Sequence, residues 1–118
     1  MAASGRLGFQ SREVGQVLVV DLSGDVVLGE EATALRKYLR AKLDEKRRPI
    51  LLNLAQVRYM DSTGVGVLVE AKAHSMGNGT QFRLCNVPPF TNKILRQLNL
   101  HEILGVYATE SEALASIQ

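Results

Sequence analysis

The stretch Met60-Asp61-Ser62-Thr63-Gly64-Val65-Gly66-Val67-Leu68 decides the predicted fold, because the chain changes from one kind of element to another within it. An apolar run at 50–54 predicts a buried strand before it, and an amphipathic pattern predicts a helix after it. Asp, Ser and Thr at such a junction are helix N-cap residues, since their side-chain oxygens accept hydrogen bonds from the first free backbone N–H groups. Those N–H groups and the helix dipole also favour a phosphate there.

Gly64 and Gly66 follow at positions where a helix favours alanine. Glycine costs up to about 1 kcal/mol in such a position. We therefore expect that some function requires the backbone to stay uncovered at this turn. A partner that approaches the first turn of the helix closely would be such a requirement.

Toward the N-terminus, the pattern predicts two strands and a turn. Residues 7–13 form a weak first strand, 14–16 a turn, and the nearly continuous apolar run at 17–22 a central strand buried on both faces. Ser23-Gly24-Asp25 is a loop signal that ends this strand. The small and polar residues 1–6 are expected to be disordered.

Two long helices are expected on either side of the strand at 50–54. The first opens at Gly29 or Glu30 and runs to about Lys46, where Pro49 stops it. The second follows Ser62. Spacings of three and four predict their buried faces: Ala32, Leu35, Leu39 and Leu43 on the first, and Val65, Leu68, Val69, Ala73 and Met76 on the second.

The remainder of the chain predicts strands at 81–86 and 103–107 and two further helices. Pro88-Pro89 is suited to the start of a helix, and Thr109 caps the last helix, with Glu112 completing a capping box. The predicted buried residues are Phe90, Ile94, Leu95 and Leu98 in the third helix, and Ala113, Leu114 and Ile117 in the last.

Strands that alternate with helices after an initial pair indicate an α/β fold, with a mixed sheet of four to five strands and about four helices. The 118 residues, 46% apolar and 22% charged, predict a single domain spanning 1–118. A net charge of +2 and an aromatic content of 5% do not favour nucleic-acid binding. We expect no membrane insertion and no signal peptide, and the single Cys85 favours a cytoplasmic location.

The order of a buried strand, Asp61-Ser62-Thr63-Gly64-Val65-Gly66-Val67-Leu68 and a helix resembles the STAS domain of bacterial anti-sigma-factor antagonists. The resemblance extends from about Val14 to Ile117. In that family the serine after the aspartate is phosphorylated by the anti-sigma kinase, and it corresponds to Ser62. The resemblance thus implies the STAS fold, a protein that is not an enzyme, and a serine kinase and a phosphoserine phosphatase as partners.

The chain departs from this family after the second predicted strand. Many antagonists carry Gly-Glu-Leu-Asp or Gly-Arg-Leu-Asp there, whereas this chain has Gly24-Asp25-Val26-Val27. Val27 therefore stands at the position of the family's aspartate, which contributes to the partner surface in typical members. Asp25, Glu30 or Glu31 are the residues that could supply the missing charge.

The site hypothesis places a phosphoacceptor at Ser62 and a partner-binding rim around it. This rim consists of Asp25, Asp61, Ser62, Thr63, Gly64 and Gly66. Spacing alone favours an ordinary N-cap at Ser62, because capping residues far outnumber phosphorylation sites, and the family resemblance reverses that preference. Thr63 is a second candidate acceptor. Asp61 is interpreted as a cap, because no second acidic residue with ligand spacing accompanies it.

No catalytic residue, metal site or cofactor is predicted. His74 and His101 fall in no catalytic or metal-binding pattern, and Cys85 lies in an apolar strand. The leading hypothesis is a phosphoregulated module that binds an anti-sigma kinase and so releases a sigma factor, as a monomer or weak dimer. The alternatives are a STAS adapter of a lipid transporter or stress-signalling complex, an enzyme, and a nucleotide-binding module without a recognisable phosphate loop.

Overall fold

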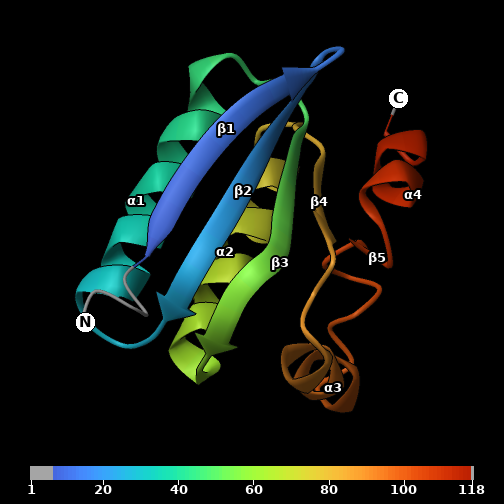
Figure 1. Cartoon of the computed structure of the whole chain (residues 1–118). Coiled ribbons are helices and arrows are strands. Elements are labelled where there is room, and N and C mark those ends of the chain that lie inside the picture. The colour runs from blue at the N-terminus through green and yellow to red at the C-terminus, as the bar shows by residue number, and fades with distance from the viewer. Residues whose placement is uncertain (1–6, 118) are drawn as a thin grey trace.

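A five-stranded mixed sheet carries helices on both of its faces in the computed structural model, which describes residues 7–117 (Figure 1). The prediction for residues 1–6 lies outside this range. The elements, in chain order, are β1 (Gly8–Val14), β2 (Val17–Val26), α1 (Glu30–Glu45), β3 (Ile50–Met60), α2 (Ser62–Gly77), β4 (Phe82–Cys85), α3 (Pro89–Gln97), β5 (Val106–Tyr107) and α4 (Glu110–Ala115).

The strands lie in the sheet in the order in which they occur in the chain, β1-β2-β3-β4-β5. The β1–β2 pair is an antiparallel hairpin, and the other three pairs are parallel. The prediction that the apolar runs at 17–22, 50–54 and 81–86 form neighbouring strands is therefore confirmed. The predicted fold class is confirmed as well.

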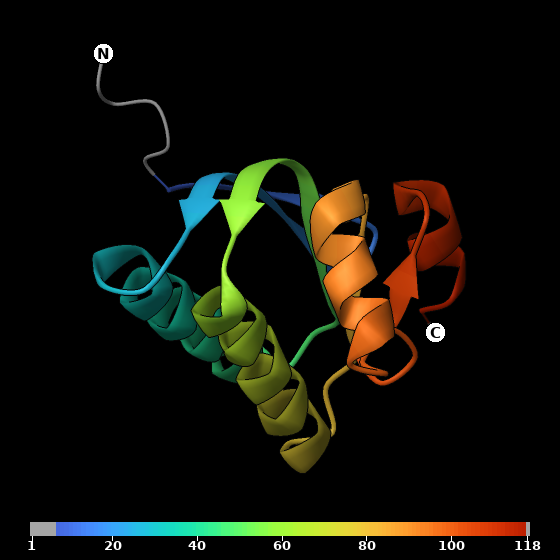
Figure 2. The same ribbon diagram turned by 90° about the horizontal axis from the view of Figure 1, so that it is seen from below.

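Two hydrophobic cores lie on the two faces of the sheet. The larger one fills the space between the sheet and the pair α1 and α2, which lie side by side beneath it (Figure 2). All four residues predicted for the buried face of α1 lie in this core. The smaller core lies under α4 on the opposite face and contains Val17, Val19, Leu51, Cys85 and Ala113.

The loop predicted at Ser23-Gly24-Asp25 is wrong, because these residues continue β2 as far as Val26. They pair with the second half of β3, which is also longer than predicted, and the register shifts between Gly24 and Asp25. Gly24 has a φ of 94°, which glycine adopts without the strain that a side chain would bring. The glycine thus accommodates an irregularity in the strand and does not end it.

The predicted buried face of α2 is only partly correct. Val65 and Leu68 are buried, but Met76 is 67% exposed and Ala73 is exposed, while Val67, Ala71 and Ser75 are buried. The reason is that α2 packs against α1 as well as against the sheet, so its buried surface is wider than one stripe. Ser75 is tolerated inside because its Oγ donates to the Lys72 carbonyl over 2.7 Å.

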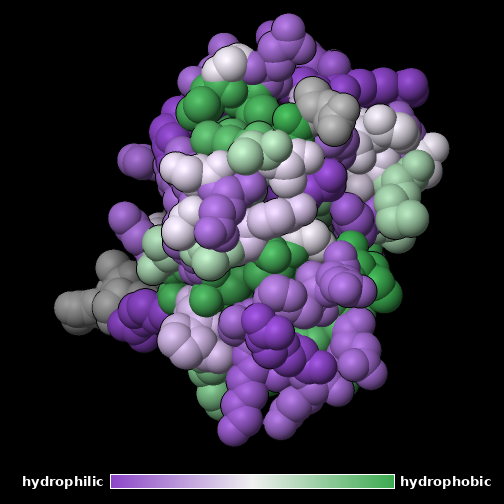
Figure 3. Space-filling view, turned by 90° about the vertical axis from the view of Figure 1, so that its right-hand side faces the viewer, coloured by the Kyte–Doolittle hydropathy of each residue, from purple (hydrophilic) through white to green (hydrophobic). Residues whose placement is uncertain are grey.

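Helix α3 buries only Thr91 and Leu95, and the prediction that Phe90 and Leu98 are buried is wrong. Phe90 is 62% exposed and Leu98 56% exposed. The helix lies at the end of the sheet where β3 and β4 terminate and does not cover a sheet face (Figure 1). On this side of the molecule, hydrophobic residues form separate patches among hydrophilic ones (Figure 3).

Candidate functional site

The candidate site lies at the end of the sheet where β2 and β3 terminate and α2 begins. Figure 2 looks onto this end, with the arrowheads of the two strands beside the first turn of α2. The loop from β2 to α1, residues 27–29, lies at the same end. Open α/β sheets place functional loops at the carboxyl ends of their strands, so the topology brings the sequence-predicted residues to one edge.

Asp61 holds this edge together. It is the N-cap of α2, and its Oδ1 accepts a hydrogen bond of 3.0 Å from the Gly64 N–H. Its Oδ2 accepts a second one, of 3.0 Å, from the N–H of Leu28 in the loop before α1. Its own N–H donates to the Val26 carbonyl over 3.1 Å. One residue therefore fixes the end of β2, the following loop and the start of α2.

The pKa of the Asp61 carboxyl is lowered from its ordinary value. Partial burial acts in the opposite direction and raises the pKa. The backbone hydrogen bonds from Gly64, Leu28 and Thr63 stabilise the charged form and together outweigh burial. Asp61 is thus an ionised cap, and the structure gives no reason to treat it as an acid or base.

Ser62 is the first residue of α2, and its side chain is exposed, while Thr63 is partly buried. Because Asp61 performs the capping, the exposed Ser62 is not needed as the N-cap. This arrangement agrees with the hypothesis that Asp61 caps while Ser62 faces outward. It leaves a hydroxyl at a helix N-terminus within reach of another protein.

The two glycines of the motif have different surroundings. Gly64 is buried, and a Cβ built on it would lie 2.6 Å from the Met60 Cγ and 2.9 Å from the Val26 carbonyl oxygen. A Cβ on the exposed Gly66 would meet nothing within 4 Å. The expectation of an uncovered backbone is therefore wrong for Gly64, which allows α2 to pack closely against the strand ends. Gly66 is exposed, and for it a functional need for an uncovered backbone stays a prediction.

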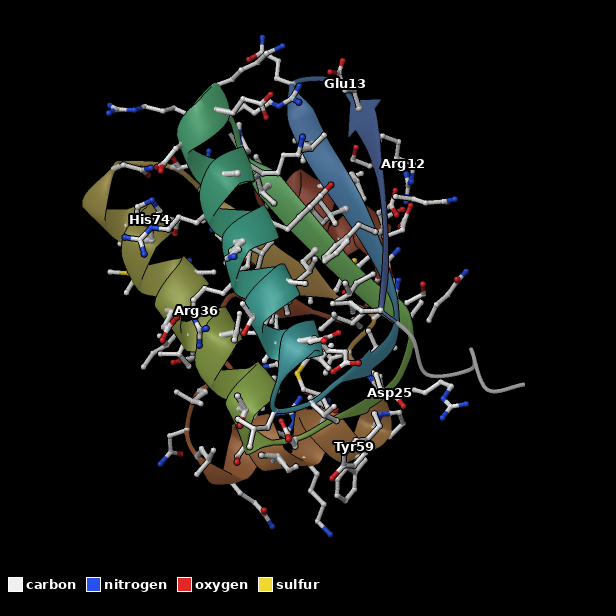
Figure 4. All side chains as sticks on the ribbon, turned by 90° about the vertical axis from the view of Figure 1, so that its left-hand side faces the viewer. Arg12, Glu13, Asp25, Arg36, Tyr59 and His74 are labelled. Atoms are coloured by element: carbon white, nitrogen blue, oxygen red, sulfur yellow. The ribbon has the colours of Figure 1, made fainter. Side chains whose placement is uncertain are left out.

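Asp25 lies in β2 and not in the loop that the sequence predicted. Its carboxylate forms an ion pair with Arg58, with an Oδ1–Nε distance of 3.3 Å. Asp25 and Tyr59 are register partners on β2 and β3, and both lie near the end of the sheet (Figure 4). The Asp25 carboxylate is thus at the predicted edge, already paired with a cation.

Exposed apolar side chains accompany these polar groups, and sequence reasoning did not include them. Leu28 is 76% exposed and its N–H is bonded to Asp61, so it stands directly beside the first turn of α2. Tyr59, two residues before Asp61, is 48% exposed. A signal was present at Leu28, since an apolar residue next to a glycine in a short loop has no strand or helix face to join.

The other reactive side chains lie elsewhere. The His74 Nε2 and the Asp44 Oδ1 are 2.7 Å apart and join α2 to α1 (Figure 4). Cys85 is fully buried, and burial raises the pKa of its thiol to about 12, so it is not a nucleophile. Within residues 7–117, no three His, Cys, Asp or Glu side chains gather as a metal site would require, and no helix is long and apolar enough to cross a membrane.

Comparison with known proteins gives a consistent set of similarities. The STAS domain family model matches residues 9–113. The chain is 30% identical over 107 residues to the anti-sigma F factor antagonist of Paenibacillus polymyxa, which covers 86% of this chain and 87% of the relative.

Solved structures agree in fold. An anti-sigma factor antagonist from Mycobacterium paratuberculosis superposes with a TM-score of 0.86 at 21% identity, covering 99% of this chain and 98% of the other. The anti-sigma factor antagonist SpoIIAA in its unphosphorylated form gives 0.75 at 22% identity, covering 92% and 95%. Bacillus SpoIIAA in its phosphorylated form gives 0.71 at 23% identity, covering 94% and 100%.

Proposed function

This chain belongs to the STAS domain family, among the anti-sigma factor antagonists, and on that premise we propose that it is a binding protein switched by phosphorylation of Ser62. Unphosphorylated, it binds an anti-sigma kinase in the cytoplasm and releases a sigma factor. The kinase transfers the γ-phosphoryl group of ATP to the Ser62 Oγ, with loss of the hydroxyl proton and departure of ADP. A phosphatase hydrolyses the phosphoester and restores the serine.

The observation that carries this proposal is that one residue at the start of α2 caps the helix while the next is exposed. Asp61 caps the helix through its hydrogen bond to the Gly64 N–H and also binds the Leu28 N–H. The exposed Ser62 side chain is therefore not required for capping. Phosphorylation would add a charge of about −1.5 to −2. At a helix N-terminus that charge is favourable for the free domain.

The same phosphate would be unfavourable in a closed interface. Leu28 is exposed beside Ser62, and Gly66 leaves open space on the first turns of α2. A partner that packs on these residues would exclude water, and an added charge without a basic group opposite it would then be uncompensated. Leu28, Ser62 and Gly66 are therefore the contacts that we assign to the kinase, and Thr63 and Asp25 would lie at the periphery of this interface.

Asp61 and Gly64 act differently in this proposal. Both belong to the internal packing of the site, so they position Ser62 and do not themselves need to touch the partner. Gly64→Arg is consequently a poor probe of binding, because bulk at this position would displace Met60 and Val26. Gly66→Arg adds the same bulk on the open side of the helix.

The test begins with a pull-down from the native cytosol, with the wild-type protein and Ser62→Asp as baits. We expect wild type to retain a kinase that Ser62→Asp does not, and calorimetry with that kinase to show binding weakened by about tenfold or more. Ser111→Asp is the matched control, since it places the same charge in the first turn of α4, and it should bind like wild type. A transporter subunit as the captured partner would instead favour the adapter function.

Incubation of the captured kinase with ATP then tests the chemistry. Mass spectrometry should place one phosphate on Ser62 and none on Thr63, and Ser62→Ala should not be labelled. Full labelling of Ser62→Ala would refute Ser62 as the acceptor. Equal binding of Ser62→Asp and wild type would refute the switch.

A further inference from the structure

A pocket of about 240 Å³ lies between α3 and β5, away from Ser62. None of its lining residues belongs to α2 or to the loop between β2 and α1. Val87 and Val106 supply an apolar part, and Asn92, Arg96 and His101 supply polar groups. A second hollow of about 240 Å³ adjoins it, and Arg96 and His101 line both.

Asn92 and Arg96 reach the pocket from the same side of α3, because residues four apart in a helix are neighbours on its surface. Within the part of the chain that the structure describes, the Arg96 guanidinium forms no ion pair. The Asn92 Oδ1 is buried and has no hydrogen-bond partner among those residues. Buried amide groups normally have such a partner, so the pocket presents one unneutralised cation, and one of its lining residues has an unsatisfied amide oxygen that is itself closed off from the surface.

His101 faces them from the loop that follows α3. Burial lowers the pKa of its ring, the positive charge of Arg96 lowers the pKa further, and the negative charge of Glu102 opposes both without outweighing them. The ring is therefore uncharged near neutral pH and presents one N–H donor and one acceptor. Arg96 is then the charged group among the lining residues of the pocket, and Glu102 lines the adjoining hollow with it.

We propose that this pocket binds a small organic anion. Its carboxylate or phosphate group would meet Arg96 and His101, and its apolar body would rest on Val87 and Val106. A ligand hydroxyl group would pair with the Asn92 Oδ1 only after the Asn92 side chain turned toward the pocket. The combination of apolar walls with a few convergent polar groups is the usual construction of a small-molecule site. The volume of the pocket alone suits a ligand with a single ring, and the adjoining hollow leaves room for a longer one.

The experiment is a titration of the full chain followed by backbone amide NMR. The probes are benzoate, 4-hydroxybenzoate, phenyl phosphate and, as an uncharged control, benzyl alcohol. We expect saturable shifts at the amides of Asn92, Arg96, His101 and Ala108 with at least one anion and none with benzyl alcohol. Comparison of benzoate with 4-hydroxybenzoate tests whether a ligand hydroxyl group pairs with Asn92. Comparison of benzoate with phenyl phosphate tests whether the pocket prefers a phosphate group to a carboxylate.

Two variants test the assignment. Arg96→Gln removes the charge from an exposed position and should weaken the binding of the anion by about tenfold. Ala108→Leu should block the pocket without changing any charge. Lys93→Gln is the matched control, since it removes a cation from the same helix outside the lining residues, and it should bind within about twofold of wild type. Unchanged affinity in Arg96→Gln, or no saturable shift with any anion at about 10 mM, would overturn the proposal.

Discussion

At the scale of single residues, the Asp61 carboxylate joins two backbone segments, the loop at Leu28, which is 33 residues before Asp61 in the chain, and the first turn of α2 at Gly64. These two hydrogen bonds connect the loop to the helix at the edge of the sheet where Ser62 lies. The charge on the carboxylate matters, because hydrogen bonds to an ionised acceptor are stronger than those to a neutral one.

Replacement of Asp61 by alanine should lower the free energy of unfolding at neutral pH by about 1–2 kcal/mol, the usual effect of losing a charged N-cap. The pKa of Asp61 is lower in the folded protein than its ordinary value of 3.8. The contribution of the ionised Asp61 carboxylate to the free energy of unfolding is therefore fully present above the ordinary pKa. It is lost as the pH falls through the pKa of the folded protein. Urea unfolding at a series of pH values from 7 to 3 measures this. The difference in the free energy of unfolding between wild type and Asp61→Ala should become smaller as the pH falls.

Asp61→Asn is the control for that experiment, since asparagine is also a good N-cap but carries no charge. It should lose less stability than Asp61→Ala at pH 7. A difference between wild type and Asp61→Ala that stays constant down to pH 3 would contradict the role of the ionised carboxylate.

The two glycines of the motif give a second prediction at this scale. Gly64→Ala should destabilise the domain by about 1–3 kcal/mol, because the new methyl group would overlap Met60 and the Val26 carbonyl. Gly66→Ala should stabilise it by up to about 1 kcal/mol, because the site is helical, open and better suited to alanine. Chemical denaturation of both variants checks the opposite signs, and equal effects would show that the packing at Gly64 is looser than described.

At the scale of elements, α4 is a short helix of 6 residues that covers the smaller core. The Thr109 Oγ1 accepts a hydrogen bond of 3.1 Å from the Glu112 N–H, which confirms the predicted N-cap. On the same face, Arg12 forms ion pairs with Asp21 and with Glu110. A helix this short depends on such contacts, because it is marginal by itself.

Thr109→Ala should therefore loosen α4 and expose the thiol beneath it. Loss of an N-cap of this kind costs about 1 kcal/mol, and Cys85 lies fully buried in the core that α4 covers. We expect faster labelling of Cys85 by a thiol reagent in Thr109→Ala than in wild type. Ser111→Ala, a change in the same turn, serves as the control, and identical labelling rates in all three proteins would refute the idea.

The elements also show why some predictions succeeded. The buried residues of α1 form a single stripe although the helix contacts both α2 and β2, so its periodicity identified them. Helix α2 contacts α1, β3 and β4, and α3 packs at the end of the sheet, so a single apolar stripe described neither of them. The capping of α2 and α4 was predictable because a cap depends on a few adjacent residues.

The site was predictable to the extent that it is local. The position of Ser62 at the start of a helix followed from its neighbours in the chain. The burial of Gly64, by contrast, depends on Val26, and the second bond of Asp61 depends on Leu28. Contacts between residues this far apart in sequence are set by strand pairing, which no local pattern contains.

At the scale of the whole molecule, stability is unevenly distributed. The core between the sheet and the α1–α2 pair contains most of the buried side chains, whereas α3 buries only Thr91 and Leu95. We expect amide hydrogen exchange to be slowest in β2 and β3 and markedly faster in α3, since segments with few buried contacts open locally. Uniform protection across all helices would contradict this distribution.

The sheet order that matches the order of the chain has a consequence for synthesis on the ribosome. Each strand that emerges finds its neighbour already made, and no strand has to wait for a later one before it can be inserted between two others. The β1–β2 hairpin forms a template, and β3, β4 and β5 extend it in turn. Nascent chains tethered at increasing lengths should therefore acquire protease resistance in steps, with a large gain once α2 has left the exit tunnel and closed the larger core.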